Sequence, residues 1–279
     1  MTEPVTGRLR VDGATLHYEM RGSGPLLLLI PGGTGGAASF DGIADDLAAD
    51  HTVASYDPRG MSRSALDDAE AAQRVAQHAD DAFRLLELLS PRVPARVAGC
   101  SSGAVVALHL LIAHPERIER VVAHEPPVVE VLPDAAEHRA LLARVQDTFR
   151  REGLMPAAAE FAAGLRRPGS DPVVVGAAAE LPPQAAARVE RTMADMPYFL
   201  GRIVPSFMAY VPDVDRLAAL SERLVLAGGE DSRGELPYRA VAFLAERFGG
   251  ELVHFPGGHT GLSTHPAEFG ALLRKVLSA

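Results

Sequence analysis

The chain has 279 residues, of which 47% are hydrophobic and 23% are charged, with a formal net charge of −9. This composition excludes a disordered chain, and the acidic balance without a basic cluster excludes a nucleic-acid-binding surface. No apolar run is long enough to span a bilayer, no export signal is visible, and the single cysteine, Cys100, excludes an internal disulfide framework. We therefore expect a soluble cytoplasmic protein without a nucleic-acid or membrane partner, and the sequence leaves a homodimer open.

The first part of the chain predicts strands that alternate with helices. Residues 7–20 alternate apolar and polar side chains around Asp12-Gly13, which is typical of a two-stranded hairpin. An unbroken apolar run at 25–30 is typical of a strand buried on both faces of a parallel sheet. Further strands are expected at "HTVASY", "ARVAGC" and "RIERVVAH", with helices at 71–89 and 104–114.

The character of the sequence changes after Pro127. Residues 128–214 are rich in alanine, helical in period and interrupted by prolines. Strand patterns return at "ERLVLAGGED" and "GGELVHFPGGH", with helices expected at 238–248 and 266–277. The alternation predicts an α/β fold with a mostly parallel central sheet, antiparallel strands at its N-terminal end and helices on both faces. The expected organisation is a core domain of residues 1–127 and 215–279 that carries a helical cap at 128–214.

A serine nucleophile is indicated by Gly99-Cys100-Ser101-Ser102-Gly103, which matches G-x-S-x-G between an expected strand and an expected helix. The sharp turn between strand and helix strains its central residue and requires small neighbours, so Ser101 is the candidate nucleophile. The backbone N–H of Ser102, at the start of the helix, is a candidate donor to an oxyanion. The second donor is expected from the glycine-rich loop after residue 30, at Gly33 or alternatively at Thr34.

A serine hydroxyl needs a base, and the base needs an acid that fixes its tautomer. We expect His259 as the base, because it follows the last strand in a glycine-rich loop at the edge where ligands bind in open α/β sheets. Two carboxylates follow other strands, Glu125 in "VVAHEPP" and Asp231 in "AGGEDS". We favour Glu125, since a carboxylate between an apolar strand and two prolines needs a partner, and Asp231, which also suits a turn, stays open as the alternative.

A nucleotide-binding interpretation competes for the same glycine-rich loop. Residues 33–38 match G-x-G-x-x-A after a strand, and Asp57 follows about 20 residues later. That interpretation leaves the serine motif and His259 unexplained, and no lysine follows the glycines as a P-loop requires. No metal-binding motif is present either. The sequence therefore predicts neither a cofactor nor a metal.

The motifs together resemble the α/β-hydrolase superfamily, over "PGG", "DPRGMSRS", "GCSSG" and "PGGH". Within it, "DPRGMSRSA", "GCSSGA", "HEPP" and "PGGH…STHPAEF" are similar to zearalenone hydrolases, lactonases that open a large resorcylic macrolactone. The resemblance implies Glu125 as the acid, and Gly33 and Ser102 as oxyanion donors. It fades over 128–214, and the chain has no tryptophan to match the indole that packs on the macrolactone there, so it implies the reaction and not the substrate.

The expected function is hydrolysis of a small-molecule carboxylic ester or lactone through an acyl-enzyme, without a cofactor. Two alternatives remain: a cofactor-free haloperoxidase or perhydrolase activity of the same residues, and a non-catalytic receptor for a small lipophilic ligand. Apolar side chains of the cap are expected to cover the site. Candidates for this cover are Phe149, Phe161, Met193, Tyr198, Phe199, Phe207, Met208 and Tyr210.

Overall fold

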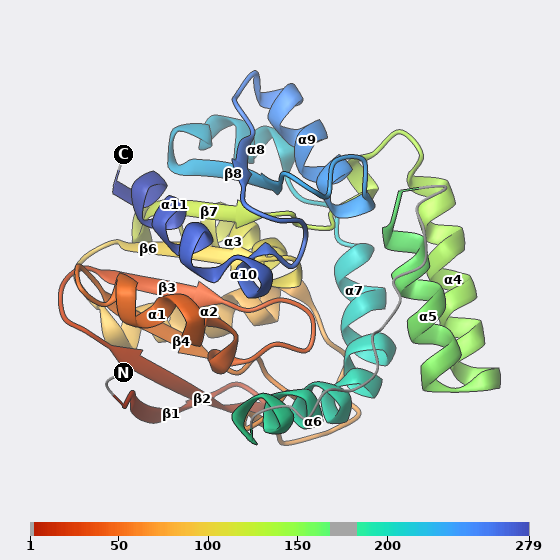
Figure 1. The fold of residues 1–279 in the computed structure, drawn as a ribbon, viewed down its shortest axis with the longest axis horizontal. Helices are drawn as coiled ribbons and strands as arrows, with labels where there is room; N and C mark the ends of the chain where they lie inside the picture. Colours follow the sequence, from red (N-terminus) through yellow and green to blue (C-terminus); the bar gives the residue numbers. More distant parts are fainter. Residues whose placement is uncertain (1–2, 168–182, 279) are drawn as a thin grey trace.

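The computed structural model describes residues 3–167 and 183–278. Within them, one nine-stranded sheet has the order β1-β2-β4-β3-β6-β7-β8-β9, and β5 pairs with β2 (Figure 1). The strands are β1 (Val5–Val11), β2 (Ala14–Arg21), β3 (Leu26–Ile30), β4 (Thr52–Tyr56), β5 (Ala65–Leu66), β6 (Ala95–Cys100), β7 (Ile118–His124), β8 (Leu224–Gly229) and β9 (Val253–Phe255).

The sheet is antiparallel at its N-terminal edge and parallel elsewhere. β1 and β2 form the expected hairpin, which closes where Val11 pairs with Ala14, and β2 is also antiparallel to β4. From β4 onward, each successive pair in the order β4-β3-β6-β7-β8-β9 is parallel. The prediction of a mostly parallel sheet with antiparallel N-terminal strands is confirmed.

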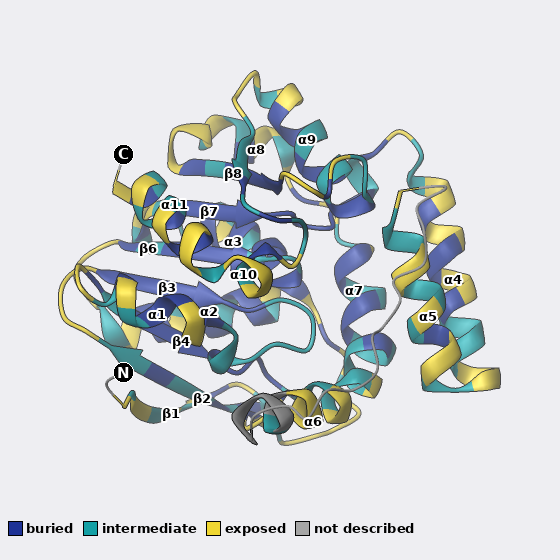
Figure 2. Ribbon diagram, in the orientation of Figure 1, coloured by how far each residue is buried: buried dark blue, intermediate teal, exposed yellow. Residues whose placement is uncertain are grey.

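Helices lie on both faces of this sheet (Figure 1). Those of the core are α1 (Asp41–Leu47), α2 (Val75–Leu89), α3 (Ser102–Ala113), α8 (Val214–Ala219), α9 (Leu236–Phe248), α10 (Gly261–Thr264) and α11 (Pro266–Ser278). Successive residues of a strand point to opposite faces, and β3 shows why its whole sequence is apolar. Leu27 and Leu29 pack in the cluster formed with α1 and α11, whereas Leu26, Leu28 and Ile30 pack in the cluster formed with α2, α3 and α9. The central strands are accordingly buried on both sides (Figure 2).

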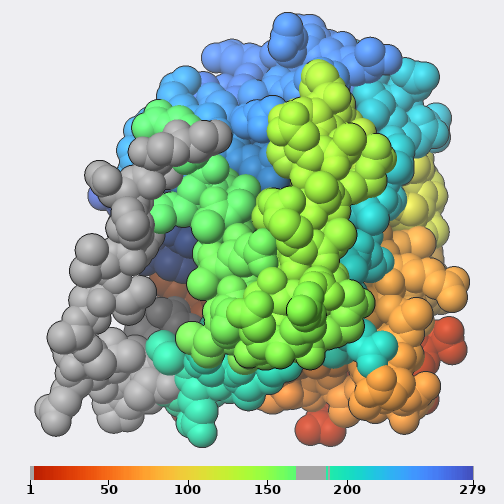
Figure 3. Space-filling model, turned by 90° about the vertical axis from the view of Figure 1, so that its right-hand side faces the viewer, coloured from red at the N-terminus to blue at the C-terminus, as the bar shows by residue number. Residues whose placement is uncertain are grey.

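The segment between β7 and β8 is helical where the structure describes it. It contains α4 (Ala135–Glu152), α5 (Leu154–Leu165), α6 (Pro183–Tyr198) and α7 (Val204–Met208), while residues 168–182 of the expected cap lie outside the described residues. Figure 3 shows the surfaces of α4 and α5, in yellow-green and green, above the teal surface of α6. Side chains from α4, α5 and α7 join the same hydrophobic cluster as α2, α3 and α9, so these helices pack against the core, beyond the carboxyl ends of the parallel strands (Figure 1).

Several local features differ from the sequence-based expectation. The helix predicted from residue 71 begins at Val75, and α1 and the short β5 were not predicted. Phe199–Ile203 form a π-helical turn between α6 and α7. Pro197 and Pro205 flank this turn, and because neither has a backbone N–H, the α-helical hydrogen-bond ladder is interrupted on both sides. No helix in 3–167 or 183–278 is long and apolar enough to cross a bilayer.

Candidate active site

Ser101 lies at the sharp turn between β6 and α3. Its φ of 53° and ψ of −123° place it in a strained conformation for a residue with a side chain. A Cβ at Gly99 would lie 2.4 Å from the carbonyl oxygen of Gly103, and a Cβ at Gly103 would lie 2.2 Å from that of Ile30. The two glycines are therefore required by close backbone packing, and they let the turn present Ser101 at the N-terminus of α3.

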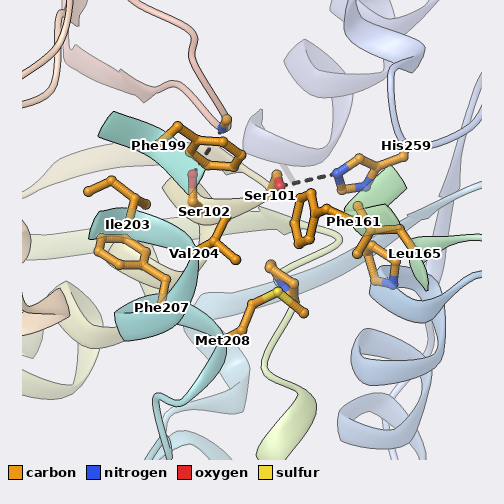
Figure 4. A pocket seen from close by; sticks show the side chains of 13 residues that line it. Ser101, Ser102, Phe161, Leu165, Phe199, Ile203, Val204, Phe207, Met208 and His259 are labelled. Atoms are coloured by element: carbon orange, nitrogen blue, oxygen red, sulfur yellow. Dashed lines mark hydrogen bonds between the residues drawn. The ribbon is translucent and has the colours of Figure 1, made fainter. Parts of the chain in front are cut away.

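His259 and Glu125 complete a hydrogen-bonded chain with this serine. His259 follows β9, and its Nε2 lies 3.1 Å from Ser101 Oγ (Figure 4). Its Nδ1 lies 2.6 Å from Glu125 Oε2. The structure thus brings together three side chains that are separated by 158 and 134 residues in the sequence. A hydrogen bond from Nδ1–H to the carboxylate leaves Nε2 free to accept the serine proton.

Glu125 is completely buried at the end of β7. Its φ of 48° turns the chain there, and its backbone N–H donates to the carbonyl of Ala227 at 2.9 Å. Its Oε1 accepts hydrogen bonds from Gly229 N–H at 2.8 Å and from the hydroxyl of Ser232. Burial by itself raises the pKa of Glu125, but the hydrogen bond and charge of His259, with the hydrogen bond of Ser232, outweigh it and hold the pKa below its ordinary value. Glu125 is therefore a carboxylate near neutral pH.

The alternative acid, Asp231, makes no hydrogen bond or ion pair with His259, whose partners among the described residues are Glu125 and Ser101. Asp231 is exposed, and its backbone N–H donates to the carbonyl of Gly257 at 2.9 Å, in the turn that the sequence also allowed. The neighbouring Ser232 is 1% exposed and is the residue of this loop that reaches Glu125. Sequence reasoning missed Ser232 and the N–H of Gly229. The available signal was a hydroxyl residue in a loop after the strand adjacent to the one that ends at Glu125.

Gly33 and Ser102 face each other beside Ser101. Gly33 has a φ of +59°, in the left-handed region that favours glycine, and its N–H donates to Ser102 Oγ at 3.0 Å. Ser102 is largely buried at the first turn of α3. Thr34, the alternative donor, lines a separate polar depression that also includes Asp57 and Arg63. The N–H of Gly33 is thus already hydrogen-bonded to the hydroxyl of Ser102 in this structure.

Asp57, which the nucleotide-binding interpretation required, has other partners. Its carboxylate accepts a hydrogen bond from the N–H of Ala37 at 2.8 Å and from Nε of Arg63 at 2.7 Å. Burial raises the pKa of Asp57. The hydrogen bonds and charge of Arg63 and the hydrogen bond from the N–H of Ala37 lower it by more than burial raises it, so the group is a carboxylate. Asp57 therefore links two loops, the one that contains Arg63 and the one that begins at Ala37. Among the residues that the structure describes, no group of three or more His, Cys, Asp or Glu side chains is placed to hold a metal.

An apolar cavity of about 180 Å³ opens beside Ser101 and His259 (Figure 4). Gly33 and Ser102 also line it. The apolar side chains that complete its wall are Pro127, Phe161, Leu165, Phe199, Ile203, Val204, Phe207, Met208 and Pro237. Of the eight cap residues expected as a cover, four line this cavity: Phe161, Phe199, Phe207 and Met208.

The other four expected cover residues lie elsewhere. The hydroxyl of Tyr198 donates to the carbonyl of Arg59 at 3.2 Å, and that of Tyr210 lies 2.9 Å from Nδ1 of His109. Met193 is 43% exposed, and Phe149 packs at Gly201 of the π-helical turn. Aromatic and apolar side chains at helical spacing thus divide between the cavity wall and the packing of the cap.

Comparison with known proteins shows the family to which the chain belongs. The family model of the α/β-hydrolase fold matches residues 25–266, and the chain belongs to this family of hydrolases. The uncharacterized hydrolase YraK of Bacillus subtilis (strain 168) is 35% identical over 277 residues, which are 97% of this chain and 95% of that protein. Zearalenone hydrolase of Bionectria ochroleuca is 36% identical over 122 residues, 42% of this chain and 45% of that protein. The expected resemblance is confirmed.

Among solved structures, a hydrolase from Pseudomonas aeruginosa PA01 superimposes with a TM-score of 0.75 at 24% identity and covers 98% of both chains. At this identity the likeness shows the shared fold alone. It extends over the helical segment between β7 and β8 as well as the sheet, because nearly the whole of both chains is matched. The predicted α/β-hydrolase fold is therefore confirmed.

Proposed function

We propose that the protein hydrolyses a carboxylic ester or lactone through an acyl-enzyme formed on Ser101. The observation that carries this proposal is the hydrogen-bonded chain from Ser101 Oγ to His259 Nε2 at 3.1 Å and from His259 Nδ1 to Glu125 at 2.6 Å. These distances lie within reach for proton transfer from the nucleophile to its base. The apolar cavity that opens at the same serine gives room for a substrate.

The proposed mechanism assigns a residue to each step of the reaction. Ser101 Oγ attacks the carbonyl carbon while His259 Nε2 takes the serine proton, and the buried Glu125 carboxylate stabilises the imidazolium that forms. His259 then gives this proton to the alkoxide oxygen of the leaving alcohol, and the C–O bond breaks. In the second half of the reaction, His259 takes a proton from a water molecule that attacks the acyl carbon, and then gives this proton to Ser101 Oγ. The acid is released and Ser101 is restored. In a lactone, the alcohol and the acid are two ends of one product.

The oxyanion of each tetrahedral intermediate would lie between the backbone N–H groups of Gly33 and Ser102. The N–H of Gly33 now donates to Ser102 Oγ at 3.0 Å. We propose that the substrate oxygen replaces this hydroxyl as the acceptor and that the Ser102 side chain turns to another rotamer. The hydroxyl is then a stand-in acceptor that keeps the N–H satisfied before substrate arrives, since an unpaired buried donor is costly.

Similar proteins support the reaction class. The curated relative that resembles the chain over 122 residues is named for hydrolysis of zearalenone. The matched part is less than half of each chain, so it supports hydrolysis at this site and leaves the substrate to be argued from the cavity.

The test is the intact mass of the protein after exposure to a fluorophosphonate, which reacts with activated serines. We expect one adduct on the wild type, none on Ser101→Ala, and an unchanged adduct on Ser221→Ala, which alters an exposed serine. Hydrolysis of a short p-nitrophenyl ester should be lost in Ser101→Ala alone. A wild type that takes up no adduct and hydrolyses no ester would refute the proposal and favour a non-catalytic receptor.

A further inference from the structure

The cavity beside Ser101 has a size and a wall that restrict the substrate. We propose that it binds the acyl part of the substrate, and that this part is a compact, uncharged, apolar group of about the size of a benzene ring. This inference rests on the proposed function, because it assigns the substrate class of the same site. It distinguishes the substrate of this protein from zearalenone, for whose hydrolysis the curated relative is named.

The volume sets the size of the group. The cavity measures about 180 Å³. For scale, an engineered cavity of about 150 Å³ in another protein, lined by Leu, Ile and Phe, binds benzene. A hexanoyl chain or a phenyl ring is on the order of this size, whereas a fatty acyl chain of about twelve carbons is well beyond it. The wall is made by packed side chains, since Ile203, Phe207 and Met208 are each only 2% exposed.

The position of the cavity relative to the catalytic groups selects the acyl side. In a tetrahedral intermediate on Ser101, the leaving oxygen must face His259, which donates a proton to it, and the oxyanion must face Gly33 and Ser102. The acyl chain takes the remaining direction. Figure 4 shows Val204, Phe207 and Met208, with Phe161 and Leu165, below the row formed by Ser102, Ser101 and His259, a direction that neither the oxyanion nor the leaving oxygen takes. Most of the apolar wall therefore lies where the acyl chain would extend.

The chemistry of the wall excludes a charged group. Among the described residues that line the cavity, none is a Lys, Arg, Asp or Glu, and the polar atoms come from the serines, His259 and backbone. A carboxylate at the end of the acyl chain would lose its water without gaining a cation, which is far more costly than burying a methyl group. The net charge of −9 also disfavours an anionic substrate.

Two matched ester series test the inference. In the first, p-nitrophenyl esters carry acyl chains from acetyl to dodecanoyl; in the second, acetates carry alcohols from ethanol to octanol. We expect kcat/KM to rise by about fourfold for each added methylene of the acyl chain, to peak near hexanoyl and to fall for dodecanoyl. The alcohol series should be nearly flat. The p-nitrophenyl monoester of adipate, which matches hexanoate in length, should be at least about a hundredfold poorer than the hexanoate ester.

Two cavity variants check the place of binding. Met208→Ala removes part of the wall and enlarges the cavity, so the preferred acyl chain should become octanoyl or longer. Phe199→Ala, at a half-buried position, serves the same purpose if Met208→Ala does not fold, as judged by circular dichroism. Met155→Ala, at a 63% exposed position on α5, is the matched control and should keep the wild-type profile. Each profile is normalised to the variant's own acetyl ester, so that a general loss of activity does not change its shape.

The outcomes separate this inference from the proposed function. Fluorophosphonate labelling of Ser101 together with a flat acyl series, a steep alcohol series, or a dodecanoyl optimum would overturn the inference and leave the serine hydrolase in place. Equal turnover of adipate and hexanoate esters would overturn the apolar assignment. Absence of both labelling and hydrolysis would refute the proposed function, and the inference would fall with it. An acyl optimum near hexanoyl that moves in Met208→Ala or Phe199→Ala, and not in Met155→Ala, would establish it.

Discussion

Replacing Glu125 by glutamine changes one oxygen of a side chain whose two oxygens have different partners. Oε1 accepts hydrogen bonds from Gly229 N–H and Ser232 Oγ, whereas Oε2 lies 2.6 Å from His259 Nδ1. Two donors hold one oxygen, so the glutamine carbonyl should take that place and the amide NH₂ should face His259. The amide is a donor, and the histidine must then present an unprotonated Nδ1 and carry its proton on Nε2. An Nε2–H cannot accept the proton of Ser101.

The magnitude follows from the wrong tautomer. The corresponding acid-to-amide change in another serine hydrolase triad lowers kcat by about 10⁴-fold, which is about 5 kcal/mol of transition-state stabilisation. We expect a loss of this order in kcat for Glu125→Gln with a short p-nitrophenyl ester, and a matching loss in the rate of fluorophosphonate labelling. Folding should be retained, because the glutamine keeps the hydrogen bonds of Gly229 and Ser232.

The control is Asp231→Asn, which alters the exposed carboxylate that the sequence left open as an acid. It should leave kcat within about twofold of the wild type. Circular dichroism of each variant confirms that the comparison is between folded proteins. A Glu125→Gln variant that keeps kcat within tenfold, or a large loss in Asp231→Asn, would refute the assignment of Glu125 as the group that orients the base.

Further predictions concern the neighbours of the site. Ser102→Ala should keep kcat/KM or raise it by about twofold to tenfold, the equivalent of one hydrogen bond, because the N–H of Gly33 loses its competing acceptor; a hundredfold fall would mean that the hydroxyl itself holds the oxyanion. Ser232→Ala should lower the free energy of unfolding by about 1.5–3 kcal/mol in urea denaturation, since it removes a hydrogen bond to a buried carboxylate, and a value equal to that of Ser221→Ala would contradict this. The pKa of Glu125 lies below its ordinary 4.5, so its ionised form contributes stability that is complete above that value and is lost as the pH falls through the folded-state pKa. As the pH falls below 4.5, the stability of the wild type should therefore decline more steeply than that of Glu125→Gln, and parallel curves would show that Glu125 is not responsible.

Local patterns were sufficient to predict the sheet and the turn at Ser101. The apolar run of β3 and the hairpin of β1 and β2 follow directly from side-chain alternation and burial, and the turn follows from steric needs at Gly99 and Gly103. Helix ends were less well predicted, since α2 begins four residues later than its apolar pattern. The π-helical turn at Phe199–Ile203, which lies between Pro197 and Pro205, was missed because a side-chain pattern does not distinguish it from an α-helical turn.

The acid could not be chosen from position alone. Glu125 and Asp231 both follow parallel strands that end at the same edge, and the difference lies in backbone direction. The chain turns at Glu125, where φ is 48°, and the carboxylate reaches the N–H of Gly229 at the end of β8, while Asp231 is exposed. The partners of Glu125, Gly229 N–H and Ser232 Oγ, come from β8 and the loop after it, more than 100 residues later in the chain. Such contacts depend on the completed sheet, and no local sequence signal specifies them.

The order of these residues along the chain has a consequence for synthesis. Gly33, Ser101 and Glu125 precede the cap, while His259 follows it and is positioned by β9, which pairs only with β8 in the described sheet. A nascent chain folds from its N-terminal part as it emerges. We therefore expect the serine turn to form before His259 has been synthesised, and the growing polypeptide to be unreactive toward a fluorophosphonate until β9 has joined the sheet. The time at which fluorophosphonate labelling begins should therefore report when β9 joins the sheet, on the ribosome or during refolding.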